Sequence, residues 1–169
     1  MADDLIQMEV ESVRVHMLSS QHVVILKEAG RERYLPIWIG PWEANAIAMR
    51  LQGLTPERPL THDLFATTLE ELGVTIRRVV IADLAAETFH ARLFLAAAGR
   101  ELEVDARPSD ALALAVRAGV EVFAAPDVLE RAGVEPEEQS EERLEVFREF
   151  VNSLDIDLGE EPREGPPRE

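Results

Sequence analysis

The stretch Asp105–Arg117 (DARPSDALALAVR) decides how the middle of this chain folds, because it joins a polar elbow to an alanine-rich helix. Pro108 suits the first turn of a helix, where its missing N–H group costs no hydrogen bond. Ser109 can accept a hydrogen bond from the N–H groups of that turn, and Asp110 lies at the positive end of the helix dipole. We therefore predict a polar elbow followed by a helix over residues 108–118.

A second stretch of the chain repeats this pattern. Glu43–Arg50 (EANAIAMR) and Asp110–Arg117 (DALALAVR) share an acid, alternating alanines and a final arginine, and a proline precedes each acid by two residues. Each stretch also follows two apolar segments that are joined at a glycine. We interpret the repeat as an internal duplication of a hairpin–helix unit. Because alanine side chains allow close approach, we expect both helices to be central and buried.

Segments rich in valine and isoleucine predict the strands of a mixed or antiparallel sheet. They are residues 8–16, 22–28, 33–39, 74–84, 88–98, 101–104 and 121–125. Besides the two alanine-rich helices, we expect Thr61 to cap a helix over residues 61–72, and Pro126 to begin a helical turn. The predicted fold class is α+β, a sheet with helices packed on it, built from a duplicated β-hairpin–helix unit and followed by a C-terminal helix.

The composition changes after residue 133 and divides the chain into three parts. Residues 1–133 form the predicted globular domain, residues 134–155 form an acidic linker with an amphipathic helix, and residues 156–169 are expected to be disordered. The apolar stripe of that helix consists of Leu144, Phe147, Phe150, Val151 and Leu154. We expect the Leu144–Leu154 stripe to dock on the domain, on a second subunit or on a protein partner.

Composition excludes several classes of site. The 169 residues contain no cysteine, which removes disulfides, thiolate zinc sites and cysteine nucleophiles. No apolar run approaches the roughly 20 residues of a membrane span, and the acidic N-terminus lacks signal-peptide features, so we expect a cytoplasmic protein with no membrane contact. The formal net charge of −16 opposes non-specific binding to nucleic acid.

Aromatic and basic residues offer two further features with alternative interpretations. Trp38 and Trp42 flank Gly40 and Pro41, and we expect them to pack in the core and not to serve as stacking platforms. Arg77, Arg78 and Arg92 lie on neighbouring predicted strands, where they can form the basic patch of the domain. The alternative is that they are solvated arginines on an exposed sheet face.

Three separated motifs resemble the bifunctional nuclease domain. They read YLPIWIGPWEANAIAMRLQG, PERPLTHDL and VDARPSDALALAVR, and the resemblance covers roughly residues 8–133. It implies an α+β domain that forms homodimers and a family that cuts both DNA and RNA, with nuclease activity in some members only. It implies no particular catalytic residues, so their assignment depends on chemistry.

Phosphodiester hydrolysis needs a nucleophilic water, charge neutralisation on the phosphate and help for the leaving oxygen. In a chain without cysteine, divalent cations such as Mg²⁺ or Mn²⁺ held by carboxylates suit this task. The candidate metal ligands are Glu43, Asp63 and Asp110. The candidate catalytic residues are His62, Asp105, Arg107 and Asp110. The candidate substrate-binding residues are Arg77, Arg92, Arg107 and Ser109.

The riskiest prediction concerns the geometry of this site. We expect Asp105, Arg107 and Asp110 to share one solvent-reachable cleft with Glu43 or with the helix start at residues 62–63. The alternative is that the acids only cap helices and that Arg107 forms a local ion pair with Asp105. The sequence then favours a non-catalytic regulatory or adaptor module acting through protein–protein contacts, for which the charge of −16 also argues.

Overall fold

The computed structural model describes residues 4–136 and residue 149. The predicted Leu144–Leu154 stripe and the tail of residues 156–169 lie outside these described residues, so both stay predictions. Within the part of the chain that is described, no helix is long and apolar enough to cross a membrane.

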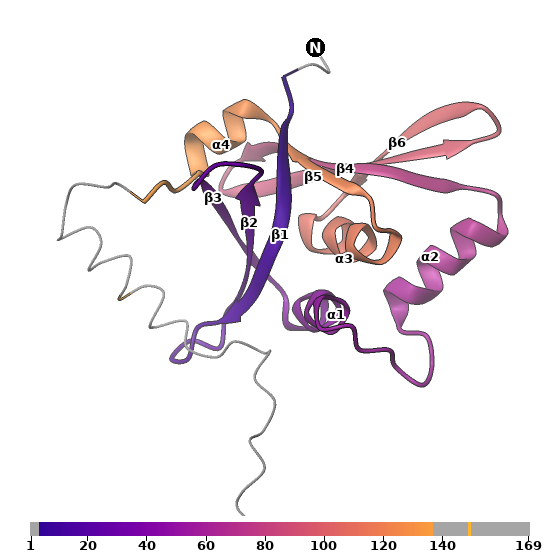
Figure 1. Ribbon diagram of the computed structural model, residues 1–169, viewed down its shortest axis with the longest axis horizontal. Helices are drawn as coiled ribbons and strands as arrows, with labels where there is room; N and C mark the ends of the chain where they lie inside the picture. Colours follow the sequence, from indigo (N-terminus) through magenta and orange to yellow (C-terminus); the bar gives the residue numbers. More distant parts are fainter. Residues whose placement is uncertain (1–3, 137–148, 150–169) are drawn as a thin grey trace, which may run out of the picture.

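The described chain folds into seven strands and four helices, which confirms the predicted α+β class (Figure 1). The predicted strands and helices of this part all form, with bounds within two residues of those expected. In chain order they are β1 (Ile6–Val15), β2 (His22–Glu28), β3 (Tyr34–Ile39), α1 (Pro41–Leu51), α2 (Thr61–Glu71), β4 (Thr75–Ala85), β5 (Thr88–Ala97), β6 (Arg100–Ala106), α3 (Pro108–Ala118), β7 (Glu121–Ala124) and α4 (Pro126–Ala132).

All seven strands belong to one mixed sheet with the order β3-β2-β1-β7-β4-β5-β6. Strands β1–β3 and β4–β6 each form an antiparallel meander, and β7 joins them by pairing antiparallel with β1 and parallel with β4. Val122 of β7 pairs with Met8 on one side and with Val79 on the other. A helix follows the third strand of each meander. The connectivity alone does not show that one rotation relates the two halves, so the duplication stays a prediction.

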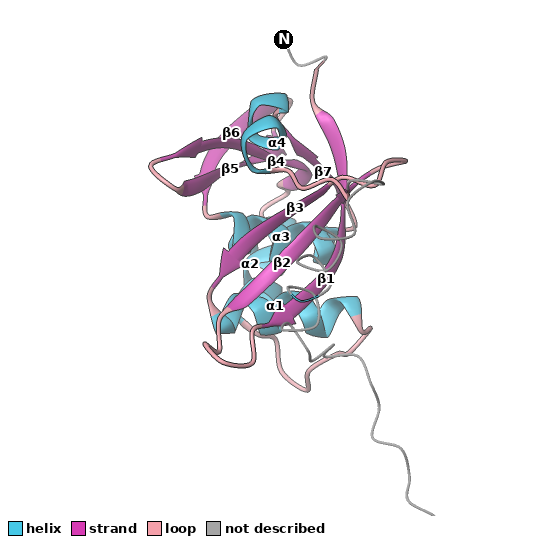
Figure 2. Cartoon of the chain, turned by 90° about the vertical axis from the view of Figure 1, so that its left-hand side faces the viewer, coloured by secondary structure: helices cyan, strands magenta, loops and turns pink. Residues whose placement is uncertain are grey.

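The two alanine-rich helices lie side by side between the two meanders (Figures 1 and 2). Helix α1 contacts β1 and β2, and α3 contacts β4 and β5. The alanines of both helices are buried, with at most 6% of each exposed: Ala44, Ala46, Ala48, Ala111, Ala113 and Ala115. The predicted central position of both helices is therefore confirmed, and their N-termini are brought close together.

The predicted helix caps are wrong in two places. The N-cap of α3 is Arg107, without a side-chain cap hydrogen bond, and Ser109 is buried in the first turn with 5% exposed. Because Pro108 occupies the first helical position, the residue before it takes the extended backbone of the cap. The N-cap of α2 is Leu60, and its N–H donates to Asp63 Oδ2 at 2.9 Å, so α2 starts without a Thr61 cap.

Helix α2 lies on the outside of the fold, where it packs against α3 and has no fully buried residue. Large apolar side chains of this region are exposed among the described residues: Leu64 is 61% exposed, Phe65 47% and the C-cap residue Leu72 72%. Within the described residues, α2 therefore presents an apolar surface to solvent.

Candidate functional site

The starts of α1 and α3 place two acids at equivalent positions. Pro41 and Pro108 each occupy the first turn, and Glu43 and Asp110 each lie at the third helical position. Side chains at this position lean back over the helix N-terminus. Because α1 and α3 pack against each other, the two carboxylates face the same region, and Arg107 precedes α3 at that point.

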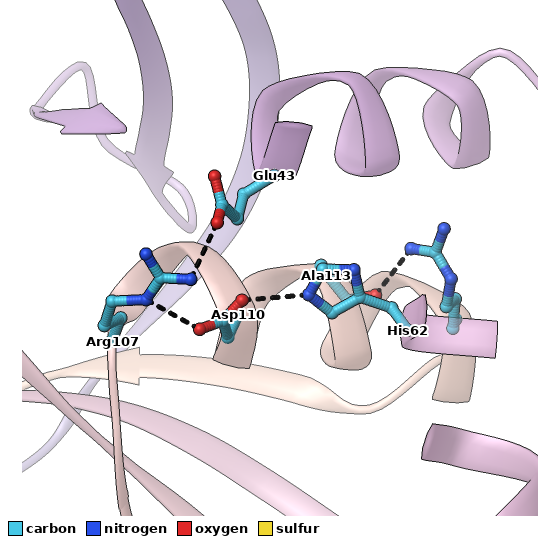
Figure 3. Close-up of polar contacts among 6 residues, drawn as sticks. Glu43, His62, Arg107, Asp110 and Ala113 are labelled. Carbon is cyan, nitrogen blue, oxygen red and sulfur yellow. Dashed lines mark hydrogen bonds and ion pairs between the residues drawn. The ribbon is translucent and has the colours of Figure 1, made fainter. Parts of the chain in front are cut away.

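Arg107 bridges the two carboxylates (Figure 3). Its Nη2 donates to Glu43 Oε1 at 2.7 Å, and its Nε donates to Asp110 Oδ2 at 2.8 Å. The other oxygen of Asp110, Oδ1, lies 3.0 Å from His62 Nε2. Both carboxylate oxygens of Asp110 therefore bind side chains, which capping of the helix would not require. We call Glu43, His62, Arg107 and Asp110 the Arg107 network.

The contacts within the network favour the charged forms of Asp110 and Arg107. Partial burial opposes ionisation of Asp110, but hydrogen bonds from Arg107 and His62 outweigh it and hold the pKa of this carboxyl below its usual range. Hydrogen bonds to Asp110 and Glu43 raise the pKa of Arg107. The Arg107 side chain is 66% exposed, whereas Glu43 and His62 expose 14% each. The network therefore presents a fixed guanidinium to solvent, backed by carboxylates and an imidazole.

Asp63 lies next to this network but serves a different contact. Its Oδ1 accepts a hydrogen bond from Arg117 Nε at 2.6 Å, and Arg117 Nη1 donates to the carbonyl of Ala113 at 2.9 Å. Arg117 is 8% exposed, so this ion pair is largely covered and joins α2 to α3. The sequence pattern contained Arg117 as the last residue of the repeated stretch, but gave no indication of its partner.

The three predicted metal ligands do not converge on one point. Glu43 and Asp110 bind the guanidinium of Arg107, and Asp63 binds that of Arg117. In residues 4–136 and 149, no group of three or more histidines and acids is arranged to hold an ion. These acids are therefore paired with two arginines, and a metal site stays a prediction.

Asp105 pairs with a residue outside the Arg107 network. It forms an ion pair with Arg92, its cross-strand neighbour in the register of β5 and β6, and Arg92 also contacts Glu103 at 3.2 Å. Arg78, on β4, contacts Glu101 of β6 at 3.3 Å. Arg77 is exposed on β4. Acids of β6 therefore match two of the three arginines in the predicted basic patch.

A pocket of about 570 Å³ adjoins the Arg107 network. The start of β2, the end of β3, the start of α1, the β4–β5 turn and the start of α3 form its walls. Its lining includes two predicted substrate-binding residues together with three aromatic or imidazole side chains: Arg107, Ser109, His22, Trp38 and Phe89. Arg107 therefore belongs to the network and also lines the pocket.

The tryptophans differ from the prediction that both pack in the core. Trp38 is 50% exposed and lines the pocket, and Trp42 is 83% exposed on the first turn of α1. In β3, Leu35 and Ile37 are buried, so the alternation of a strand turns Trp38 to the other face. That alternation was visible in the sequence and could have identified Trp38 as a surface residue.

Comparison of the sequence with known proteins identifies the family of this chain. The bifunctional nuclease domain matches residues 24–137, a range that contains the whole Arg107 network. An uncharacterized protein of Mycobacterium tuberculosis strain H37Rv is 42% identical over 160 residues, which are 89% of this chain and 96% of that protein. Bifunctional nuclease 1 of Oryza sativa subsp. japonica is 28% identical over 114 residues, 65% of this chain and 34% of that protein. The chain therefore belongs to the bifunctional nuclease domain family.

Proposed function

We propose that this protein hydrolyses phosphodiester bonds of DNA or RNA and that the Arg107 network is its active site. The observation that carries the proposal is the line of contacts Glu43–Arg107–Asp110–His62, which puts an exposed guanidinium beside a histidine oriented by a carboxylate. A guanidinium suits paired contacts with phosphate oxygens. The similarity to a rice protein named bifunctional nuclease 1 supports the same reaction class.

Each residue of the network has a role in this mechanism. The N–H groups of Arg107 that Glu43 and Asp110 do not engage bind phosphate oxygens and offset the negative charge that grows as water attacks phosphorus. When His62 Nε2 carries its proton toward Asp110, Nδ1 is left to accept a proton from the attacking water. The water oxygen then bonds to phosphorus as the bond from phosphorus to the ester oxygen breaks, and the leaving oxygen takes a proton from solvent. Glu43 holds the guanidinium in position.

Nuclease assays on purified protein test this proposal directly. End-labelled DNA and RNA, single- and double-stranded, are incubated with the protein and with His62→Gln or Asp110→Asn. We expect both variants to lose about 100-fold or more in rate, the usual effect of removing a general base or its orienting carboxylate. Asp127→Asn is the matched control, because Asp127 is an acid in the first turn of α4, outside the network. Equal cleavage by all variants would reject the network as the site.

Asp105→Asn distinguishes the sequence prediction from the geometry. The sequence prediction gave Asp105 a catalytic role, whereas its side chain is 70% exposed and paired with Arg92. If the Arg107 network is the active site, Asp105→Asn keeps most of the activity. A loss as large as that of Asp110→Asn would instead mean that the site extends along β6.

A requirement for Mg²⁺ or Mn²⁺ is a separate proposal, and the mechanism above assigns no step to a cation. The arginines beside Glu43, Asp63 and Asp110 argue against a shared ion in the present arrangement. Dialysis against a chelator followed by assays with each cation tests the requirement. Activity that returns only with a cation would show that the metal is needed and that its ligands must be sought by substitution of acids.

The second candidate function is a non-catalytic adaptor. The observation that favours it is the pairing of Arg78 and Arg92 with acids of β6, which offsets the positive charge of these two arginines. An adaptor would bind a protein and cleave neither DNA nor RNA. Protein that cleaves none of the four substrates, with or without Mg²⁺ and Mn²⁺, would support this reading.

We also propose that the protein is a homodimer. The exposed apolar residues Leu64 and Phe65 of α2, with Leu72 at its C-cap, supply a surface that a second copy can cover. Light scattering of the full chain gives the mass. A dimer that dissociates in Phe65→Asp supports this surface, and a dimer that persists in that variant points to another one, such as the predicted Leu144–Leu154 stripe.

A further inference from the structure

The pocket beside Arg107 takes no part in the mechanism above. Its volume of about 570 Å³ lies within the range of about 300–1,000 Å³ that is typical of small-molecule sites. Arg107 lines it and also binds Glu43 and Asp110. A group that enters the pocket is therefore adjacent to any phosphate that Arg107 holds.

Aromatic side chains form part of the pocket wall. Trp38 comes from β3 and Phe89 from β5, so the two rings are supplied by different meanders of the sheet. Trp38 exposes half of its surface, so much of its ring is not used in packing the core. Nucleic-acid bases stack on exposed aromatic rings with little dependence on sequence. The pocket wall thus offers a surface for the flat face of a base.

The charges around the pocket decide where affinity for a nucleic acid can come from. The chain has a net charge of −16, and the two carboxylates bound to Arg107 offset much of its attraction for phosphate. Contacts to phosphate supply most of the affinity of ordinary non-specific binding. Here the bases must supply a larger share. Glu87, which also lines the pocket, can accept a hydrogen bond from an exocyclic amino group such as that of cytosine.

We infer that the pocket lined by Trp38, Phe89 and Arg107 receives one unstacked base, and that the protein therefore selects single-stranded DNA or RNA. This inference rests on the proposed function, because it takes Arg107 as the phosphate contact of the scissile strand. In a duplex the bases are paired and stacked, so one must first be flipped out before it can enter. A single strand presents its bases without that cost.

The chain contains only two tryptophans, which allows each to be used as a separate reporter. Trp42→Phe leaves Trp38 as the sole indole, and Trp38→Phe leaves Trp42. Each full-length variant is titrated with a nuclease-resistant phosphorothioate strand of about 12 nucleotides, within the site sizes of single-strand binders. We expect the fluorescence of Trp38 to be quenched and that of Trp42 to stay unchanged. Quenching of Trp42 alone, or of neither residue, would overturn the inference.

Affinity gives a second and independent readout. By fluorescence anisotropy, Trp38→Ala should weaken binding of the single strand by about tenfold or more, the lower part of the range for losing one base-stacking contact. Trp42→Ala should change it less than twofold. A strand of the same length without bases should bind the wild-type protein at least about tenfold more weakly. Equal binding of the strands with and without bases would show that the pocket does not hold a base.

Binding and cleavage can fail separately in this design. If the quenching and affinity results are as expected but no substrate is cut, the base pocket stands and the proposed nuclease function fails. If single and double strands are cut at equal rates and Trp38→Ala binds as well as wild type, the nuclease function stands and the base pocket is rejected.

Discussion

The starts of α1 and α3 have the same framework and different chemistry. Each has a proline in the first turn and an acid at the third position. They differ at the N-cap, which is Gly40 in α1 and Arg107 in α3, and at the second position, where Trp42 is 83% exposed and Ser109 is 5% exposed. Only the α3 start contains a cation, and that cation binds the acid of both helices. One residue that differs thus turns two similar helix starts into one network.

The C-terminal ends of the same helices show a second difference. Arg50 and Arg117 occupy equivalent positions in the two helices. Within the described residues, the Arg50 side chain makes one hydrogen bond, from Nε to the backbone carbonyl of Val116 at 3.5 Å. Arg117 is buried against Asp63 of α2. Helix α2 packs on α3, so only α3 receives an ion partner from it. The asymmetry of the site therefore arises from what lies next to each helix.

The largest expected effect comes from removing the cation that distinguishes α3. Arg107→Ala should lower kcat/KM about 100-fold or more, equivalent to at least about 2.7 kcal/mol, as for other losses of a preorganised phosphate or oxyanion contact. Arg107→Lys should restore little, because an ammonium is a point charge and cannot reproduce the fork that bridges two carboxylates. Arg50→Ala is the control. Steady-state kinetics that show equal loss in Arg50→Ala would remove the distinction between the two helices.

The next effect concerns the burial of the two alanine-rich helices. Ala113→Leu should lower the free energy of unfolding by about 1–3 kcal/mol through overpacking, because Ala113 of α3 is fully buried. Ala46→Leu should cost less within the same range, since 4% of Ala46 is exposed. Ala118→Leu, at the exposed end of α3, is the control. Urea denaturation measures the unfolding free energy of all three variants. An Ala113→Leu variant as stable as wild type would mean that the core around α3 has room for a larger side chain.

Local pattern was enough to predict α1, α3 and the residues of the Arg107 network, because prolines, acids and alanines act within one or two helical turns. It was not enough for Asp105. That side chain lies on β6, and its pairing with Arg92 follows from strand register, which depends on residues far along the chain. The exposure of Trp38, in contrast, follows from a local feature, the alternation of buried and exposed side chains along β3. Contacts across elements, such as Asp63 with Arg117, follow only from how helices pack.

A smaller effect is expected at the two equivalent arginines. Arg117→Met should cost about 1–2 kcal/mol, below the value for a fully buried pair because Asp63 is 28% exposed. Arg50→Met, on the exposed side of α1, should cost less than about 0.5 kcal/mol. Urea midpoints of both variants at neutral pH give this comparison. If the two costs are equal, the Arg117–Asp63 contact adds no net stability.

Low pH should reduce the difference in stability between wild type and Arg117→Met. Burial opposes ionisation of Asp63, but the Leu60 N–H and Arg117 outweigh it and hold its pKa below the ordinary value of 3.8. A carboxyl with a depressed pKa stabilises the fold above its unfolded pKa, and this contribution is lost as pH falls through the folded pKa. The gap in unfolding free energy between wild type and Arg117→Met should therefore be full near pH 7 and shrink below about pH 3.8. A gap that is constant with pH would mean that packing, and not charge, causes it.

The smallest effect tests the glycine that stands where α3 has Arg107. A Cβ at Gly40 would lie 2.4 Å from Glu43 Oε2, so Gly40→Ala must push the carboxylate aside. The backbone of Gly40 is extended, with φ −73° and ψ 157°, a conformation that alanine adopts without strain, so stability should hardly change. The shifted Glu43 should no longer position Arg107, and kcat/KM should fall about three- to tenfold, or about 0.7–1.4 kcal/mol. A double-mutant cycle with Glu43→Gln identifies the cause, because Gly40→Ala should have no further effect once Glu43 has lost its charge. An undiminished effect in that background would mean that Gly40 acts through the path of the chain into α1 and not through the carboxylate.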